Sequence, residues 1–327
     1  MTDKAEAPAV VYADYELPHH IWVTYSVLDR TFETFIGPVA AKIYTPRPTG
    51  APEATTAPMV PGVPSEAWDP ATQWTTTYAG FGTENKTALR RIALELREEE
   101  RTVPELYPLH ATDPHLKIQH VVENYMDEWF EHVVDWVTVI TGEDINPRQP
   151  VYDGNPHARG LRTWSDHGWQ PGGFRITTPR PLAITDVALI AILDRVASSD
   201  RPPLEHQLRR DANQAFVRAD FRKAALDAAT AVEVCLIHAI EETARNTGQQ
   251  IPREERRKRD RGIISRSNWL TENKTGYQAH DGLKELADLR NGVIHNGADA
   301  DRDTARRVVE TANAIVDSLG GSPDPRT

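Results

Sequence analysis

The stretch LRNGVIHNG, residues 289–297, holds residue types that can act on a phosphate group. Arg290 and His295 are separated by four residues, and Asn291 directly follows the arginine. A histidine titrates near neutral pH and can transfer a proton, whereas an arginine stays charged and can bind two oxygens of one phosphate. The segment therefore offers a proton-transfer group and an anion-binding group close together in sequence.

The helix expected around Arg290 places this charge on an apolar face. At about 100° per residue, Leu283, Leu286, Val293 and Ile294 form one stripe, and Arg290 falls inside it. A guanidinium group on a dry face needs a partner, because an unpaired buried charge is strongly unfavourable.

A second charge, Glu233, lies on the apolar face of an Ala-rich helix upstream. Its neighbours on that face are Leu226, Ala229, Ile237 and Ile240. Both buried charges become tolerable if they meet, so we expect the carboxylate and the guanidinium to form an ion pair between two helices. Such a pair could serve only to fix the register of the helices, or it could belong to a functional site.

The Arg-x4-His spacing alone is not specific, because Arg162 with His167 and Arg201 with His206 match it too. Only the third match lies at a helix end, has Asn after Arg, and follows an Ala-rich helix that bears an acid. This set of features resembles the HEPN superfamily, the higher eukaryotes and prokaryotes nucleotide-binding domains. FRKAALDAATAVEVCLIHAI is similar to the second helix of that family, and LKELADLRNGVIHNG is similar to its Arg-Asn-x-x-x-His helix. The resemblance covers residues 205–320, and the Apea-like branch is the most similar.

The resemblance implies an all-α bundle that forms a homodimer. Many family members are metal-independent endoribonucleases of toxin, antiphage-defence or RNA-processing systems. By position, Arg290 and His295 would form the catalytic pair, with Asn291 beside them and Glu233 holding the arginine. RNA would be cleaved by attack of the 2′-OH on the adjacent phosphate, with no cofactor and no metal. The alternative is a non-catalytic HEPN module that binds RNA, nucleotide or a protein partner.

Helix geometry argues against a tight pair within one chain. Arg290 and His295 point about 140° apart on an ideal helix, so we expect a composite site, shared across a homodimer or completed by fraying near Gly297. Alternatively, His295 serves only as a favourable charge at a helix C-terminus. Where a nucleotidyltransferase partner modifies HEPN toxins, Tyr stands two residues after His; this chain has Gly297, so that regulation is not expected.

A basic segment at residues 253–261, REERRKRDR, is a candidate RNA-binding surface. Because Glu and Asp alternate with its cations, a merely solvated charged loop is the alternative. The candidate RNA-binding residues are Arg253, Arg256, Arg257, Lys258, Arg259 and Arg261.

The C-terminal segment, residues 201–327, reads as a four-helix HEPN-like bundle. We expect amphipathic helices at 203–218, 220–245, 281–296 and 301–319, the last opened by an Asp cap.

The N-terminal segment, residues 1–200, reads as a mixed, β-rich domain, which makes the fold class α+β. Alternating apolar residues predict strands near 10–28, and residues 87–101 favour a strand over a helix. The Pro-rich residues 46–70 are expected to form an extended surface loop, and residues 150–181 an irregular loop. Helices are expected at 115–141, ended by Gly142, and at 184–197, the second apolar nearly all round and so buried between two bodies.

Other chemistry has little support in this sequence. His115, His120 and His132 lie on or near the 115–141 helix with Glu128 one turn before the last of them, but histidines on a boundary face are commoner than a metal site. The N-terminal domain has no phosphate-loop motif, no GxSxG and no HExxH, so an independent enzyme there is not indicated.

The charge distribution, the cysteine content and the hydrophobicity of the sequence limit its partners and its cellular location. The net charge is −11, yet residues 202–327 contain 20 of the 37 basic and 20 of the 48 acidic residues, so the N-terminal part carries the whole excess. RNA contact would therefore need a local patch rather than the global field, and the acidic domain is a candidate surface for a protein partner. Cys235 is the only cysteine, expected in a core, and no apolar run is long enough to span a membrane, so we expect a cytoplasmic protein without membrane association.

Overall fold

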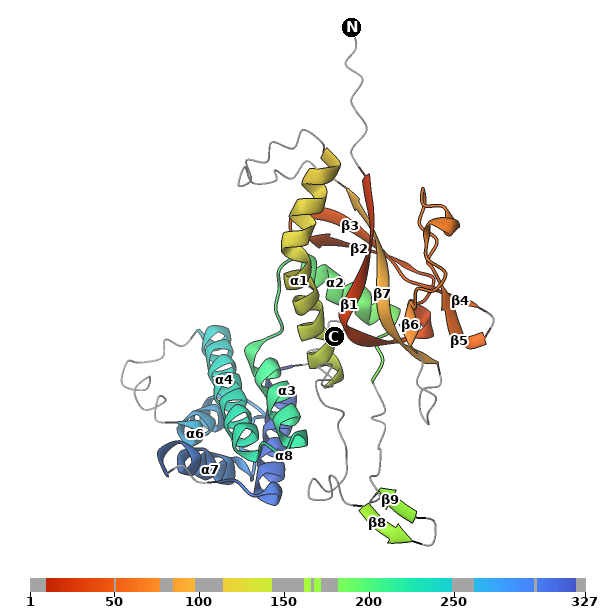
Figure 1. The fold of residues 1–327 in the computed structure, drawn as a ribbon. Helices are drawn as coiled ribbons and strands as arrows, with labels where there is room; N and C mark the ends of the chain where they lie inside the picture. Colours follow the sequence, from red (N-terminus) through yellow and green to blue (C-terminus); the bar gives the residue numbers. More distant parts are fainter. Residues whose placement is uncertain are drawn as a thin grey trace. The chain divides into compact units, whose positions relative to one another are not determined.

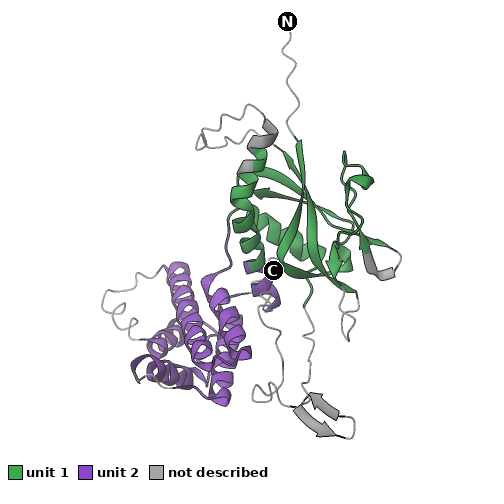
Figure 2. Ribbon diagram, in the orientation of Figure 1, with its two compact units in different colours: residues 1–134, 144–199 green, residues 135–143, 200–327 purple. Residues whose placement is uncertain are grey.

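A computed structural model describes residues 10–49, 51–76, 85–97, 114–142, 162–165, 168–171, 182–248, 262–296 and 299–321. The chain divides into two compact units, residues 1–134 with 144–199 and residues 135–143 with 200–327 (Figure 2). The first contains an antiparallel sheet and the second is helical, so the fold is α+β, as predicted.

Within the described residues, five strands of the first unit form one antiparallel sheet in the order β1-β7-β3-β2, and β6 also pairs with β7 (Figure 1). Their bounds are β1 Val10–Thr24, β2 Thr31–Ile36, β3 Val39–Tyr44, β6 Thr75–Thr76 and β7 Lys86–Arg97. The predicted strand character of residues 10–24 and of 87–97 is thereby confirmed, whereas Tyr25–Val27, expected in the same strand region, form a short 3-10 helix.

One face of this sheet is apolar and is covered by two helices, α1 (Pro114–Thr141) and α2 (Asp186–Ala197). Phe130 of α1 meets Tyr15 of β1 edge to face, with ring centroids 5.9 Å apart. Thr34 of β2 donates a hydrogen bond to the backbone oxygen of Leu193 in α2. Gly37, in the β2–β3 turn at φ 56°, lies so close to the Tyr125 ring of α1 that a Cβ there would overlap it.

Both helices were predicted, but the surroundings of α2 differ from the expectation. The α1 helix ends where Gly142 adopts φ 69°, as its C-terminal glycine predicted. The α2 helix is not buried all round: Ile192 is fully buried on the sheet side, while Val187 and Ile190 are 55% and 45% exposed. The helix has apolar side chains all round, and the sheet covers only those on one side of it.

The Pro-rich residues 46–70 form only in part the extended surface loop that was expected. Its start forms a hairpin of β4 (Arg47–Thr49) and β5 (Ala51–Thr56). Val60 and Trp74 are buried against Tyr44 and Ala93, on the second face of the main sheet. Prolines disfavour central strands and helices, but the apolar side chains between them still gain by covering this face.

The region 150–181 was expected to be an irregular loop, and this too is corrected. It contains a two-stranded hairpin of β8 (Arg162–Ser165) and β9 (Gly168–Pro171). Four paired positions join the strands, including Trp164 opposite Trp169.

The described helices of the second unit confirm the four that were predicted and add one. Their bounds are α3 Leu204–Val217, α4 Phe221–Thr247, α6 Ile263–Asn273, α7 Leu283–Asn296 and α8 Arg302–Leu319. The additional helix is α6, and it packs against both α4 and α7. The Asp cap predicted for the last helix is Asp301, whose carboxylate accepts a hydrogen bond from the backbone N–H of Thr304.

The α4 helix lies at the centre of the bundle and contacts α3, α6, α7 and α8. Small side chains make this possible, because Ala224, Ala228, Ala229 and their neighbours are essentially inaccessible to solvent. Cys235, on the same helix, is buried as expected, and burial raises the pKa of its thiol to about 12.

Within the part of the chain that the structure describes, every helix is too short or too polar to cross a lipid bilayer.

Candidate functional site

The structure brings Glu233 and Arg290 together, as the sequence predicted. Nη2 of Arg290, on α7, lies 3.2 Å from Oε1 and 3.3 Å from Oε2 of Glu233, on α4. Both side chains are partly exposed, Glu233 to 18% and Arg290 to 31%, so the pair lies at the edge of the bundle core rather than inside it.

A third charged residue, Arg266 of α6, faces the same carboxylate. Its Nη1 lies 3.7 Å from Oε1 of Glu233, and its side chain is only 13% exposed. That nitrogen is buried and makes no hydrogen bond within the described residues. One carboxylate thus faces two guanidinium groups, and the three side chains, here called the Glu233 triad, carry one net positive charge.

Sequence reasoning did not include Arg266 because the helix that carries it was not predicted. A signal was present: Arg266 follows Ile263 by three residues and precedes Leu270 by four, so all three lie along one side of a helix. Ile263 and Leu270 are both buried in the bundle core. Arg266 is therefore the same kind of charge beside an apolar stripe that drew attention to Arg290.

The buried stripe of α7 is narrower than predicted. Leu283, Leu286 and Val293 are buried, but Ile294, which was expected on the same face, is 49% exposed. Arg290 consequently lies at the boundary of the stripe, where its guanidinium group can reach both Glu233 and solvent.

Asn291 and His295 are both exposed on α7. Oδ1 of Asn291 accepts a long hydrogen bond of 3.4 Å from Nη1 of Arg290. His295 makes no hydrogen bond or ion pair among the described residues and is not brought to Arg290 within this chain. Polar contacts thus link Glu233, Arg266, Arg290 and Asn291, and among the described residues His295 forms no hydrogen bond or ion pair with them.

Two expectations fall outside the described residues. The basic segment 253–261, with Arg253, Arg256, Arg257, Lys258, Arg259 and Arg261, is one of them. Gly297, beyond the end of α7, is the other.

The Arg201–His206 match to the Arg-x4-His spacing is part of the bundle scaffold. His206 is 1% exposed, and its Nε2 lies 3.2 Å from the backbone oxygen of Gly320. Burial lowers the pKa of His206, although the Gly320 carbonyl opposes that effect. Arg201 instead lies 3.5 Å from Asp135. His167, of the remaining match, lies outside the described residues.

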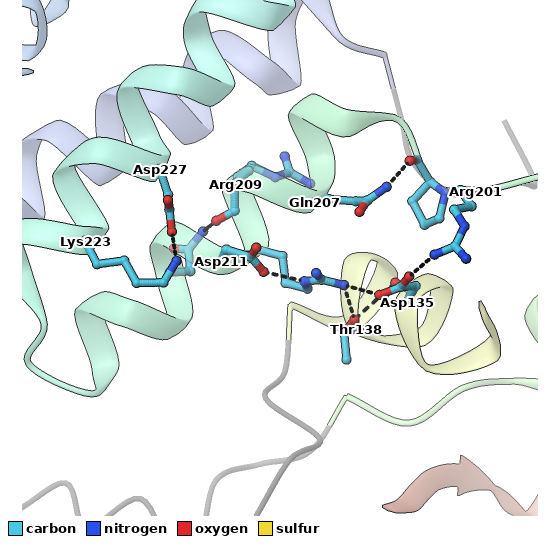
Figure 3. Close-up of polar contacts among 11 residues, drawn as sticks. Asp135, Thr138, Arg201, Gln207, Arg209, Asp211, Lys223 and Asp227 are labelled. Atoms are coloured by element: carbon cyan, nitrogen blue, oxygen red, sulfur yellow. Dashed lines mark hydrogen bonds and ion pairs between the residues drawn. The ribbon is translucent and has the colours of Figure 1, made fainter. Parts of the chain in front are cut away.

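Asp135 anchors a separate polar network between the end of α1 and α3 (Figure 3). Nη1 of Arg210 donates to Oδ1 of Asp135 and to Oγ1 of Thr138, both at 2.9 Å, and its Nε donates to Asp211 at 2.9 Å. Arg210 thus has anionic partners on two sides, unlike Arg266, so this network fits a structural role.

The structure describes the side chain of one α1 histidine, His132, which lies beside a carboxylate one helical turn earlier. Nε2 of His132 lies 3.7 Å from Oε1 of Glu128, and the His132 ring is largely buried. Among the described residues, no three His, Cys, Asp or Glu side chains are grouped as metal ligands. The side chains of His115 and His120 lie outside the described part of the chain.

Comparisons with family models, with curated proteins and with solved structures found no match to this chain, so the candidate site has to be interpreted from its own geometry.

Proposed function

We propose that the protein is a metal-independent endoribonuclease of the HEPN type, acting as a homodimer in toxin, antiphage-defence or RNA-processing systems. The observation that supports the proposal is the ion pair between Glu233 and Arg290, held on two helices at a partly exposed position. It joins the two segments on which the HEPN resemblance rests, the Ala-rich helix and the Arg-Asn-x-x-x-His helix.

In the proposed reaction, the 2′-OH of one nucleotide attacks the adjacent phosphorus and the 5′-oxygen leaves, which produces a 2′,3′-cyclic phosphate. His295 transfers the proton, since an imidazole can both accept and donate a proton and this side chain is exposed. Arg290 binds the phosphate oxygens and stabilises the charge that develops on them. Asn291 orients the phosphate, and Glu233 holds Arg290 in its rotamer through the observed ion pair.

The site is proposed to be composite because His295 and Arg290 are not in contact within one chain. In a homodimer, the two copies of α7 would line a shared cleft, so that His295 of one copy could act beside Arg290 of the other. The exposed apolar side chain of Ile294, directly before His295, is suited to such an interface. The N-terminal domain would act as a sensor, an inhibitor or a partner-binding module of a cytoplasmic protein.

The direct test is to incubate the purified protein with total RNA in EDTA and to examine the fragment ends. We expect 2′,3′-cyclic phosphate ends from the wild type, and a loss of at least about a hundredfold in the His295→Ala variant. Lys284→Ala is a matched control, because Lys284 is exposed on the same helix and lies outside the Glu233 triad. If correctly folded His295→Ala cuts RNA as fast as wild type, the catalytic assignment is wrong.

The alternative function is a non-catalytic HEPN module that binds RNA, nucleotide or a protein partner. The separation of His295 from Arg290 within one chain favours this alternative, because it leaves an anion-binding group without a proton-transfer group beside it. Retained binding of RNA or nucleotide, with no cleavage of any RNA, would select this function.

A further inference from the structure

We infer that Arg266 is a positioning residue of this site: it shares Glu233 with Arg290 and so keeps Arg290 from being neutralised, leaving one net positive charge for a substrate phosphate. The inference rests on the proposed function in so far as Arg290 is the residue that binds phosphate. It goes further by assigning a role to α6, which the HEPN resemblance did not assign.

The contact geometry shows a carboxylate divided between two cations. Oε1 of Glu233 lies 3.2 Å from Nη2 of Arg290 and 3.7 Å from Nη1 of Arg266. Neither arginine forms a short, paired contact with the carboxylate, which two parallel N–H···O bonds would give. The negative charge is therefore insufficient for the two guanidinium groups around it.

Arg266 cannot easily find another partner. Its side chain is 13% exposed, and its Nη1 is buried without a hydrogen bond among the described residues. Ile263 and Leu270 are buried on either side of it along α6. The hydroxyl of Ser267 lies 2.8 Å from that of Tyr277 and helps to hold this helix in place. Because Arg266 is mostly shielded from water and has no other anionic partner among the described residues, its charge acts mainly on Glu233.

Arg290, by contrast, retains an edge that can bind a ligand. Its side chain is 31% exposed, and its Nη1 contacts only Oδ1 of the exposed Asn291, at 3.4 Å, among the described residues. A phosphate oxygen could replace that weak contact with a charge-assisted hydrogen bond. Because Arg266 also attracts Glu233, the carboxylate does not cancel the field that a phosphate meets at Arg290.

A structural role and this electrostatic role predict different outcomes when charges are removed. The triad carries one net positive charge in the wild type, none in Arg266→Met, two in Glu233→Gln, and one in the variant with both changes. If charge controls phosphate binding, Glu233→Gln should restore the binding that Arg266→Met loses. If Arg266 only supports the fold, the two substitutions should add or worsen each other.

The experiment measures the binding of a short fluorescein-labelled single-stranded RNA by anisotropy, with every variant in a His295→Ala background so that the RNA stays intact. Arg266→Met should weaken binding about tenfold, and Glu233→Gln should tighten it by a few fold. The double variant, and Arg266→Lys, should bind within about twofold of the parent. Lys284→Met removes an exposed charge of α7, the helix that carries Arg290, outside the triad, and should change binding by about twofold or less.

Two outcomes would overturn the inference: Arg266→Met binds RNA as well as the parent, or the double variant binds no better than Arg266→Met. Circular dichroism of each variant checks folding, and if Arg266→Met does not fold, Arg266→Lys and the double variant still test the charge rule. The measurement is independent of cleavage. If the double variant regains RNA binding but wild type cuts no RNA, only the nuclease proposal is refuted. If cleavage depends on His295 but the double variant does not regain binding, only the role of Arg266 is refuted.

Discussion

Two poorly exposed carboxylates, Glu95 in the sheet unit and Glu233 in the helical unit, meet arginines in different ways. Glu95, on β7, is 2% exposed and accepts a hydrogen bond of 2.7 Å from the hydroxyl of Tyr44 and one of 2.6 Å from Nε of Arg97. Glu233 has longer contacts and is shared by two arginines. Short hydrogen bonds to both oxygens of a carboxylate, as at Glu95, are typical of a structural group. Arginines that share one carboxylate, as at Glu233, keep part of their positive charge and can bind an anionic ligand.

The pKa shifts around Glu95 agree with this distinction. Burial opposes ionisation of Glu95, but the hydrogen bonds from Tyr44 and Arg97 outweigh it and hold the pKa of the carboxyl below its ordinary value. Burial, together with the hydrogen bond to Glu95, raises the pKa of Tyr44 well above its ordinary value. Tyr44 therefore remains a neutral donor to an ionised acceptor over the whole physiological range.

The largest expected effect on stability is that of Glu95→Ala. It leaves the Tyr44 hydroxyl buried without an acceptor and removes the partner of Arg97, so we expect a loss of about 3 kcal/mol in the free energy of unfolding of the sheet unit. Hydrogen–deuterium exchange of β7 peptides measures that loss locally. The matched variant is Glu33→Ala, on β2 of the same sheet, whose side chain is 81% exposed and whose loss should cost less than about 0.5 kcal/mol. If Glu95→Ala and Glu33→Ala lower the free energy of unfolding equally, Glu95 does not have the structural role assigned to it.

A smaller, pH-dependent effect is expected from Tyr44→Phe. Above about pH 4.5, where an unfolded glutamate is ionised, loss of this donor should cost about 1.5 kcal/mol. Because the pKa of Glu95 is lowered by folding, its contribution disappears as pH falls through that folded value. Exchange or urea unfolding at several pH values should show wild type and variant converging in acid. A difference that stays constant down to acidic pH would show that the hydrogen bond does not stabilise the ionised form.

The smallest effect on stability is expected from Glu233→Gln, at about 1 kcal/mol, because Arg290 and Glu233 are both partly exposed and glutamine can still accept a hydrogen bond. The variant should gain more thermal stability from added sulfate than the wild type does, since an anion can replace the missing charge. Thermal unfolding of both proteins with and without sulfate checks this. An identical gain in both would show that the two guanidinium groups do not form an anion site.

Periodicity was a sound guide to elements whose burial is one-sided. The alternation in β1 and the apolar stripes of α1 and α8 reflect which side of each element is buried, so the local pattern carried the information. It failed in part for residues 46–70: the prolines suggested a surface loop, but residues 47–56 contain paired strands and Val60 is buried against the second face of the sheet. It also failed for α6, whose 11 residues include few apolar positions.

The candidate site was predictable in part. Glu233 and Arg290 could be paired because each placed a charge on an apolar stripe, and only a partner makes such a charge tolerable. Arg266 carried a similar signal, a charge beside the Ile263 and Leu270 stripe, but its contact with Glu233 could not be predicted, since that contact depends on how α6 packs against α4. The exposure of Ile294 was likewise not evident from its helical position.

The sequence alone determined the α+β class, most of the helices and the encounter of Glu233 with Arg290, because helical and strand periodicity is local and buried charge requires compensation. Only the tertiary structure decided that a second arginine shares the carboxylate and that Glu95, on the polar face of its strand, is nearly inaccessible. Those features depend on which side chains, distant along the chain, come to pack against one another, and no repeat of two or 3.6 residues encodes that choice.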